Sequence, residues 1–570
     1  MKEEAASAAF FMVASRVHAL GILCFAWAWL AWDHYRPWVN FHSEALALAA
    51  VGFLILSRLV HHRLGVAQAP RAVGLVLTVA LVPWIQYLLG ISFFAGDALV
   101  ASLYLCGLAA AIWVGFTLAQ DFEKNTLAMT SIFYVLWFVA FASAAIGLLQ
   151  WLNLQAVLAM YVLQADAGDR ALSNLGQPNQ LATLLLMGMA TLAWTFERGR
   201  IGGAGLTVGA AFLTMVLALT QSRAGMLSAA AMATFLIWKL RGGHFRLKPK
   251  HVVGWLLAFG LTLWLLPYFQ DALLIGASRS MNPGIDNARL SIWKQVLKGI
   301  GQAPWFGYGW NQTPTAHAAG SLAFPGSMTF THAHNVILDL VAWNGIPLGL
   351  LLAGVCVYWL ASRSRGVTRP TAVYAFACVL PISIHSLVEF PFAFSYFLVA
   401  AGLMVGVVEA SRSTVKTLPF KVRWAASIVA AWFAIGSYIV YEYLLIEEDY
   451  RIVRFENLRI GRTATDYQVP HVWMLSHMAA MLKAARQRPA RGMDAEELEN
   501  LRKVSSRFAY GAVRFRYALA LGLNGNPHEA TRQMAILRGM YGDFYYQAGV
   551  GELRALQRDE YPELSQVVTP

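Results

Sequence analysis

Two histidines that could take part in proton transfer lie at the start of a long apolar stretch. They occur in Thr331-His332-Ala333-His334-Asn335. An imidazole titrates near neutrality and can accept a proton from a hydroxyl group. Positions two apart do not share a helix face, and the zinc spacing of two histidines four apart is absent, so no metal site is predicted. We predict His334 as a general base supported by His332 and Asn335. A purely structural role and the choice between His332 and His334 both stay open.

Two arginines could bind a phosphate group. Arg223 lies in the tight turn Gln221-Ser222-Arg223-Ala224-Gly225, and Arg289 lies near the start of a predicted helix. A guanidinium can bind phosphate through two parallel hydrogen bonds. Lys294 and Tyr308 are predicted as supporting residues. The alternatives are that Arg223 reaches toward lipid headgroups and that the segment around Arg289 is an interfacial amphipathic helix.

Two further polar clusters flank apolar segments. The first, residues 173–180, places amides at a predicted helix start, where unpaired backbone N–H groups favour an anion; an ordinary helix cap explains it equally well. The second contains His385 and Glu389, four positions apart, so the two could pair on one helix face or join neighbouring helices. The supporting residues predicted from these clusters are Gln177, Asn179, Gln180, Glu389 and Tyr396.

The composition indicates a membrane protein. Of the 570 residues 58% are hydrophobic and only 13% are charged, and the mean hydropathy is +0.51. Soluble domains carry about a quarter charged residues. The net charge of +13 sits in short loops between apolar segments, which argues against a nucleic-acid-binding domain.

Thirteen apolar segments are candidate membrane spans, so the predicted fold class is an all-α polytopic membrane protein. With the N-terminus inside, the inside loops hold seventeen Lys and Arg residues and the short outside loops hold three. This asymmetry predicts the direction of insertion and an odd number of spans. All the polar clusters then lie at the outer boundary. The segments are residues 15–32, 45–60, 72–90, 98–119, 127–150, 179–195, 203–220, 226–238, 252–268, 334–360, 371–388, 392–410 and 424–443.

Two larger hydrophilic pieces are predicted outside the membrane. A transmembrane domain over residues 1–443 contains an outer loop at residues 270–333, and residues 444–570 form a helical tail domain. Within the tail, residues 514–541 are expected to form two helices around Asn524-Gly525-Asn526-Pro527. This hairpin could be a single tetratricopeptide-like unit, or an ordinary helical hairpin.

These residues, in this order, resemble the bacterial O-antigen ligase/polymerase superfamily over most of residues 170–400. Within it the chain looks most like the protein O-oligosaccharyltransferases that glycosylate pilins. The supporting stretches are residues 176–182, residues 385–391, the run Pro83…Gln86…Gly90…Gly96-Asp97 and the long tail. The superfamily motifs are matched by His334-Asn335, Ser222-Arg223, Arg289…Trp293 and Pro304…Gly307-Tyr308-Gly309.

The resemblance implies a GT-C-like fold in the bacterial inner membrane, with the active site and the C-terminus in the periplasm. It implies en bloc transfer of an oligosaccharide from a polyprenyl (undecaprenyl) pyrophosphate carrier to Ser or Thr hydroxyls of a periplasmic protein such as a pilin. The implied reaction inverts the anomeric centre, and no metal or cofactor is expected. Arg223 and Arg289 would bind the pyrophosphate and His334 would activate the hydroxyl.

Three alternatives remain. An O-antigen ligase would use lipid A–core as the acceptor, and a glycan polymerase would use another glycan; both would share the same site. A secondary transporter would place polar residues near the middle of the membrane and would show inverted repeats. The clusters at one boundary do not fit that pattern.

Overall fold

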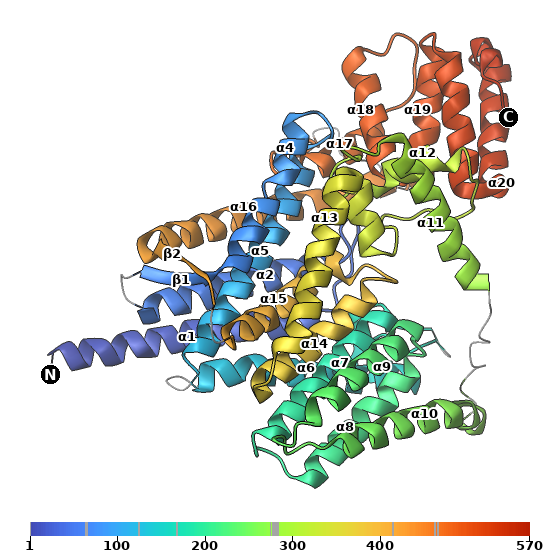
Figure 1. Cartoon of the computed structure of the whole chain (residues 1–570). Coiled ribbons are helices and arrows are strands. Elements are labelled where there is room, and N and C mark those ends of the chain that lie inside the picture. The colour runs from blue at the N-terminus through green and yellow to red at the C-terminus, as the bar shows by residue number, and fades with distance from the viewer. Residues whose placement is uncertain are drawn as a thin grey trace. The chain divides into compact units, whose positions relative to one another are not determined.

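A computed structural model describes residues 2–62, 66–122, 126–166, 169–273, 275, 284–412, 415–460, 463 and 467–569. Within these ranges the chain forms twenty α-helices, four short 3-10 helices and one two-stranded sheet (Figure 1). The strands β1 (Val66–Pro70) and β2 (Thr417–Lys421) pair antiparallel, with Gln68 opposite Pro419. The sequence did not predict this sheet, because both strands lie in short basic loops.

The helices cover every predicted span. The segment predicted at residues 72–90 is broken into two helices, α3 and α4. Eight helical stretches are long and apolar enough to cross a membrane within the described residues. The protein is therefore a multi-pass, mainly helical membrane protein, and the number of spans stays a prediction. The helices up to α16 are α1 (Lys2–Leu30), α2 (Phe41–His62), α3 (Arg71–Val79), α4 (Val82–Leu88), α5 (Ala95–Gln120), α6 (Thr126–Trp151), α7 (Pro178–Glu197), α8 (Gly203–Leu219), α9 (Arg223–Leu240), α10 (Pro249–Ala272), α11 (Gly284–Gln302), α12 (Thr313–Ser321), α13 (Val336–Gly366), α14 (Pro370–His385), α15 (Ser395–Ala410) and α16 (Val422–Leu458).

Within the described residues, the predicted tail begins with the last part of α16 and then contains four further helices and a short 3-10 helix, Pro562–Gln566. The two helices expected around Asn524–Pro527 are α19 and α20. The predicted outer loop at residues 270–333 contains α11 and α12, and its residues 274 and 276–283 lie outside the described residues. The tail helices are α17 (Ser476–Arg486), α18 (Ala495–Arg507), α19 (Gly511–Leu523) and α20 (Pro527–Asp559).

The chain divides into two compact units. Unit 1 comprises residues 1–79, 104–280 and 357–437, and unit 2 comprises residues 80–103, 281–356 and 438–570. Three of the boundaries between the two units fall inside helices, namely α5, α13 and α16.

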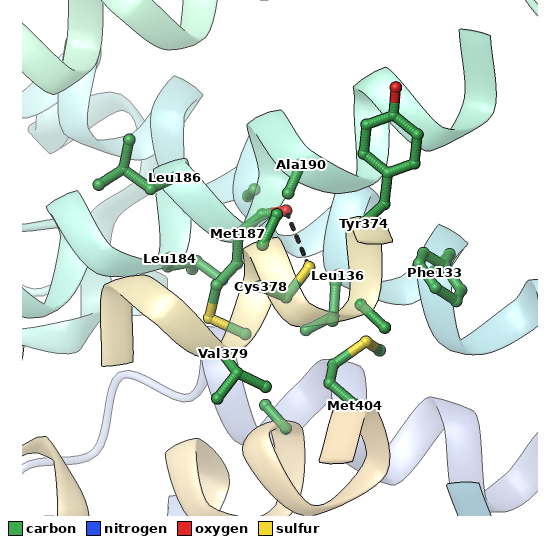
Figure 2. Packing of buried hydrophobic residues seen from close by; sticks show 14 of the residues in the cluster. Phe133, Leu136, Leu184, Leu186, Met187, Ala190, Tyr374, Cys378, Val379 and Met404 are labelled. Atoms are coloured by element: carbon green, nitrogen blue, oxygen red, sulfur yellow. Dashed lines mark hydrogen bonds between the residues drawn. The ribbon is translucent and has the colours of Figure 1, made fainter. Parts of the chain in front are cut away.

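Unit 1 is built around α7. Every residue of this helix from Gln180 to Phe196 is buried, against α6, α8, α9 and α14. A helix that is apolar on all sides belongs in the centre of a bundle. Figure 2 shows part of this core, in which Cys378 of α14 donates to the backbone oxygen of Met187 at 3.8 Å. Phe133 of α6 stacks on Trp194 with 4.1 Å between ring centroids.

Unit 2 contains a break in α13 that receives a loop. Gly345 has φ 77° and ψ 170°, so the helical hydrogen bonds stop there. The carbonyls of Ala342 and Trp343 instead accept from the N–H groups of Tyr308 and Gly309 at 2.9 and 3.0 Å. A Cβ on Gly345 would lie 2.2 Å from the Trp305 oxygen, so only glycine permits this approach. The glycine-rich loop that contains Gly307 and Gly309 is thus bonded to a broken helix.

The segment 80–97 of unit 2 braces the same loop. The Gln86 side chain is buried. It accepts from the N–H of Trp310 at 2.8 Å and donates to the backbone oxygen of Trp343 at 2.9 Å. Further along the segment, Asp97 binds Arg507 of α18 through both carboxylate oxygens. The run around Gln86 and Asp97 therefore holds both the loop and the tail.

A buried histidine lies beside that ion pair. His477 of α17 is buried next to Asp97 and Arg507, and burial lowers the pKa of its imidazole from 6.5 to about 4. Asp97 favours the imidazolium and Arg507 opposes it. The folded protein therefore holds His477 neutral where the unfolded chain would already protonate it.

We predict that unit 2 loses stability as the pH falls from about 6.5 to 4, because in that interval the unfolded state binds a proton at His477 that the folded state excludes. The loss is on the order of 3 kcal/mol. Thermal unfolding of the detergent-solubilised protein across this range measures it. His477→Gln should reduce the pH dependence, whereas His528→Gln, at an exposed position of α20, should keep it. Equal pH dependence in His477→Gln and the unmodified protein would contradict this assignment.

Candidate active site

In unit 1, Asn179 connects three polar residues from different segments. Its side-chain oxygen accepts from the hydroxyl of Ser222 at 2.7 Å and from Arg170 Nη2 at 3.3 Å. Its amide nitrogen donates to Glu389 Oε1 at 3.3 Å. The predicted residues Asn179 and Glu389 therefore lie together, beside the turn that carries Arg223.

The turn before α9 fixes the position of Arg223. Ser222 caps the helix, because its hydroxyl oxygen accepts from the N–H of Gly225 at 2.9 Å. A Cβ on Gly225 would lie 2.7 Å from Ala182 of α7, so the start of α9 is held tightly against α7. Arg223 is the first residue of α9 and is partly exposed.

The other predicted amides form a cap and a link between helices. Gln177 caps α7 by accepting from the N–H of Gln180 at 2.8 Å. Gln180 in turn accepts from the hydroxyl of Tyr396 at 2.8 Å, and Tyr396 is completely buried beside Trp29. Gln177 therefore caps α7, as the cap interpretation expects, and the binding role of the cluster stays a prediction.

His385 and Glu389 both bond to α7, so the interpretation that they join neighbouring helices is confirmed. The His385 ring makes a 2.8 Å hydrogen bond to Thr183, and Glu389 accepts from Asn179, four positions earlier on α7. Helix α14 ends at His385, but the N–H of Glu389 still donates to the His385 oxygen at 2.9 Å. The chain leaves the helical conformation at Phe390, the residue before Pro391, as expected before a proline.

In unit 2, the buried carboxylate of Asp339 organises the segment that contains both candidate histidines. Its Oδ1 accepts from the backbone N–H of Ala333 at 2.9 Å and from the hydroxyl of Thr313 at 2.7 Å. Its Oδ2 lies 3.7 Å from His332 Nδ1. The rings of His332 and Trp343 also meet at 69°, with 6.0 Å between their centroids. Asp339 therefore fixes the segment through a backbone N–H and a hydroxyl, with the His332 imidazole beside its second oxygen.

His334 has an unusual backbone conformation held from both sides. Its φ is 55°, in the left-handed region that residues other than glycine rarely adopt. On one side, Trp293 of α11 donates to the Ala333 oxygen at 3.0 Å. On the other, the Asn335 side chain caps α13 by accepting from the N–H groups of Ile337 and Leu338. Such conformations persist where the surroundings impose them, often at functional sites.

The His334 ring is oriented by its own segment. Its Nδ1 lies 3.1 Å from the His332 backbone oxygen. A carbonyl oxygen can only accept, so Nδ1 carries the hydrogen and Nε2 keeps the lone pair of the neutral ring. This is the tautomer that a general base needs.

Arg289 shares a helix face with Trp293, because the two are four positions apart on α11. One turn, about 5.4 Å, separates them along the axis. Arg289 therefore lies near the segment that carries His334. Lys294 is exposed on the next position of α11, away from that face.

Tyr308 packs the glycine-rich loop against α11. Its hydroxyl donates to the Gly299 oxygen at 2.7 Å, and burial raises its pKa to about 12. These contacts hold the loop in place, and the phenol stays protonated at neutral pH.

The predicted residues thus gather in two groups. Sequence reasoning missed Thr183 and Asp339 and treated Arg170 only as a loop charge. Asp339 could have been recognised as a candidate from the sequence, because it is an ionisable residue inside a predicted span. Among the described residues, no three His, Cys, Asp or Glu side chains are arranged to hold a metal ion. The group in unit 1 is Arg223, Gln177, Asn179, Gln180, Glu389 and Tyr396; the group in unit 2 is Arg289, Lys294, Tyr308, His332, His334 and Asn335.

Three family models match successive parts of the chain. Residues 173–196 match "Protein glycosylation ligase", residues 208–353 match "O-Antigen ligase" and residues 373–552 match "Virulence factor membrane-bound polymerase, C-terminal". The first covers the amide cluster and α7, and the second covers the segments with Arg223, Arg289 and His334.

Two curated proteins of Acinetobacter baylyi are similar over long stretches. The general O-oligosaccharyltransferase is 28% identical over 536 residues, or 91% of each chain. The ComP-specific O-oligosaccharyltransferase is 26% identical over 371 residues, or 64% of this chain and 66% of its own length.

Parts of the chain are thus similar to O-antigen ligase-like enzymes of the membrane, which are glycosyltransferases. Within that class the chain is a relative of the protein O-oligosaccharyltransferases, as the sequence resemblance predicted.

We predict that Asp339→Ala lowers glycan transfer at least about 10-fold, because it leaves the Ala333 N–H and the Thr313 hydroxyl buried without their acceptor, at about 1–3 kcal/mol each. Asp339→Asn keeps an acceptor oxygen and should retain more activity. Transfer assays on purified protein of matched folded yield measure both. Asp559→Ala, at an exposed carboxylate, is the control. Full activity in Asp339→Ala would contradict the positioning role.

Proposed function

We propose that the protein transfers a preassembled oligosaccharide en bloc from a polyprenyl (undecaprenyl) pyrophosphate carrier to Ser or Thr hydroxyls of periplasmic proteins, such as a pilin. The two O-oligosaccharyltransferase relatives and the protein glycosylation ligase match support a protein acceptor. The single observation that carries the mechanism is the orientation of His334, whose Nδ1 donates within its own segment beside the Arg289 face of α11.

In the proposed reaction, the acceptor hydroxyl gives its proton to His334 Nε2 while its oxygen forms a bond to the anomeric carbon. The bond from that carbon to the pyrophosphate oxygen breaks at the same time, and polyprenyl pyrophosphate leaves. Direct displacement inverts the anomeric centre. Arg289 and Arg223 neutralise the charge on the leaving group, since guanidinium groups bind phosphate oxygens in pairs. With the charge carried by arginine, we propose that transfer needs no metal.

His334 fits the role of base better than His332. His332 has its Nδ1 3.7 Å from the buried carboxylate of Asp339 and its ring in a T-shaped contact with Trp343. An imidazole held between a carboxylate and an indole is suited to positioning the segment. His334 has the strained backbone and the oriented lone pair.

The proposed location is the bacterial inner membrane, with the active site and the C-terminus on the periplasmic side. The excess of Lys and Arg in alternate loops supports this direction, seventeen residues against three. A lipid-linked donor in the outer leaflet could then enter from the side, and secreted acceptors would meet it outside the cytoplasm.

We predict that His334→Ala abolishes transfer while the lipid-linked donor still binds, because the acceptor hydroxyl then lacks a base. His332→Gln should retain part of the activity. The assay mixes purified protein, lipid-linked glycan and either a pilin-like peptide or rough lipopolysaccharide, and follows which acceptor gains mass. Transfer to the lipopolysaccharide alone would favour the O-antigen ligase alternative. Unchanged turnover in His334→Ala would remove this residue from the mechanism.

A second prediction concerns the arginines. Arg289→Lys should lower transfer nearly as much as Arg289→Ala, because an ammonium group cannot reproduce the two parallel hydrogen bonds of a guanidinium. Arg558→Lys, at an exposed position of α20, is the matched control. The same assay run in EDTA should show unchanged rates. Full activity in Arg289→Lys would argue against bidentate binding, and loss in EDTA restored by magnesium would contradict metal independence.

A further inference from the structure

In unit 2, one face of the short helix α12 contacts the chain on both sides of His334. Thr313 and His317 are four positions apart, so they share a face of this helix. The Thr313 hydroxyl donates to Asp339 Oδ1 at 2.7 Å. The His317 ring lies flat on the Phe330 ring, with 3.9 Å between the centroids and 20° between the planes. Both rings of this stack are buried. The face therefore holds the chain before His334 as well as after it.

The opposite side of α12 rests on the tail. Thr315 donates to the backbone oxygen of Ser506, in the last turn of α18, at 3.0 Å. Ala318 packs against Met540 of α20. A helix turns by about 100° per residue, so positions 315 and 318 lie across α12 from the Thr313 and His317 face. Figure 1 shows α12 beside the tail helices. The tail thus supports α12 from behind.

Helix α12 is also packed directly on α11. A Cβ on Gly320 would collide with the backbone oxygen of Gln295, and a Cβ on Gly299 would collide with that of Ala316. Only glycine permits two backbones to approach so closely. Contacts with α11 and with the tail therefore fix the helix that carries His317.

The chain that leads to His334 depends on side-chain contacts for its path. Residues 325–335 form neither helix nor strand. Asp339 and Trp293 hold this stretch at Ala333, through its backbone N–H and its oxygen. Phe330 lies three positions earlier, so its stack on His317 fixes a second point. A catalytic group has to be held to within about 0.5 Å by packing and hydrogen bonds around it.

The contact uses the flat ring of His317 and not its nitrogen atoms. Neither ring nitrogen has a hydrogen-bond partner among the described residues. Burial lowers the pKa of the imidazole to about 3, and Arg514 of the tail opposes protonation further, so the ring is neutral near pH 7. A buried polar group without a partner lowers stability. Aromatic rings in a stack attract each other beyond the apolar area that they bury.

We propose that His317 is a positioning residue for glycan transfer, which fixes the place of His334 by stacking on Phe330. The inference rests on the proposed function, in which His334 accepts the proton of the acceptor hydroxyl. A misplacement of about 1 Å, caused by a change far from the reacting atoms, can lower the rate of a reaction on the order of 100-fold. Loss of the stack should therefore slow the transfer step itself.

The test compares His317→Leu with His317→Phe in the full-length protein. Both changes remove the unpartnered nitrogens, and only phenylalanine keeps a flat ring. The measurement is kcat per donor-binding site, with lipid-linked glycan and the acceptor that the unmodified protein glycosylates. Counting donor-binding sites corrects for molecules that fail to fold. His317→Leu should lower this kcat about 10-fold and leave the KM for donor and acceptor unchanged, whereas His317→Phe should retain most of the activity.

His477→Leu is the matched control. His477 is also buried in unit 2, and its ring lies parallel to the Phe508 ring. This change should lower the number of folded molecules without lowering kcat per donor-binding site. An unchanged kcat in His317→Leu would overturn the inference, as would an equal loss in His317→Phe or in the control. If the unmodified protein glycosylates only lipopolysaccharide, the proposed function fails, while the comparison still tests His317.

Discussion

The buried carboxylate of Asp339 is the interaction on which the candidate catalytic segment depends. A buried carboxylate is costly unless its oxygens are paired, and here Oδ1 accepts from a backbone N–H and a hydroxyl, while an imidazole nitrogen lies 3.7 Å from Oδ2. Those partners come from α12 and from the segment before α13. One carboxylate thereby holds together pieces of chain that the sequence separates. The left-handed conformation of His334 follows from that constraint together with the indole of Trp293 and the cap of Asn335.

In unit 1 a neutral amide side chain takes the corresponding role. Asn179 offers an oxygen to Ser222 and Arg170 and a nitrogen to Glu389, so a single amide satisfies three partners. The arrangement places a carboxylate and two arginines at neighbouring helix ends without exposing charge to the apolar core. Polar side chains therefore serve two purposes in this protein. They satisfy helix ends in an environment poor in water, and they hold the candidate phosphate-binding side chains in place.

The sequence predicted the elements better than the contacts. Apolar length identified the helices of all the predicted spans, because it needs no knowledge of neighbours. The candidate residues were found because polar groups beside apolar segments are rare. The role of Asp339 depended on α12, which no periodicity connects to α13, and the bonds of His385 and Glu389 depended on α7 residues that lie 202 and 210 positions away. The small sheet escaped notice because its strands are five residues each and lie in basic loops. Contacts between residues far apart in the sequence could not be predicted from the sequence pattern alone.

The break at Gly345 has a consequence for how this chain can vary in evolution. Two carbonyls of α13 are satisfied by consecutive N–H groups of the loop at Tyr308 and Gly309. Insertion or deletion of one residue between Pro304 and Gly309 would shift that register and leave the carbonyls unsatisfied in a setting with little water. Loop length and helix break must therefore change together. Among homologues this stretch should vary in its side chains while keeping a constant length, unlike an ordinary loop.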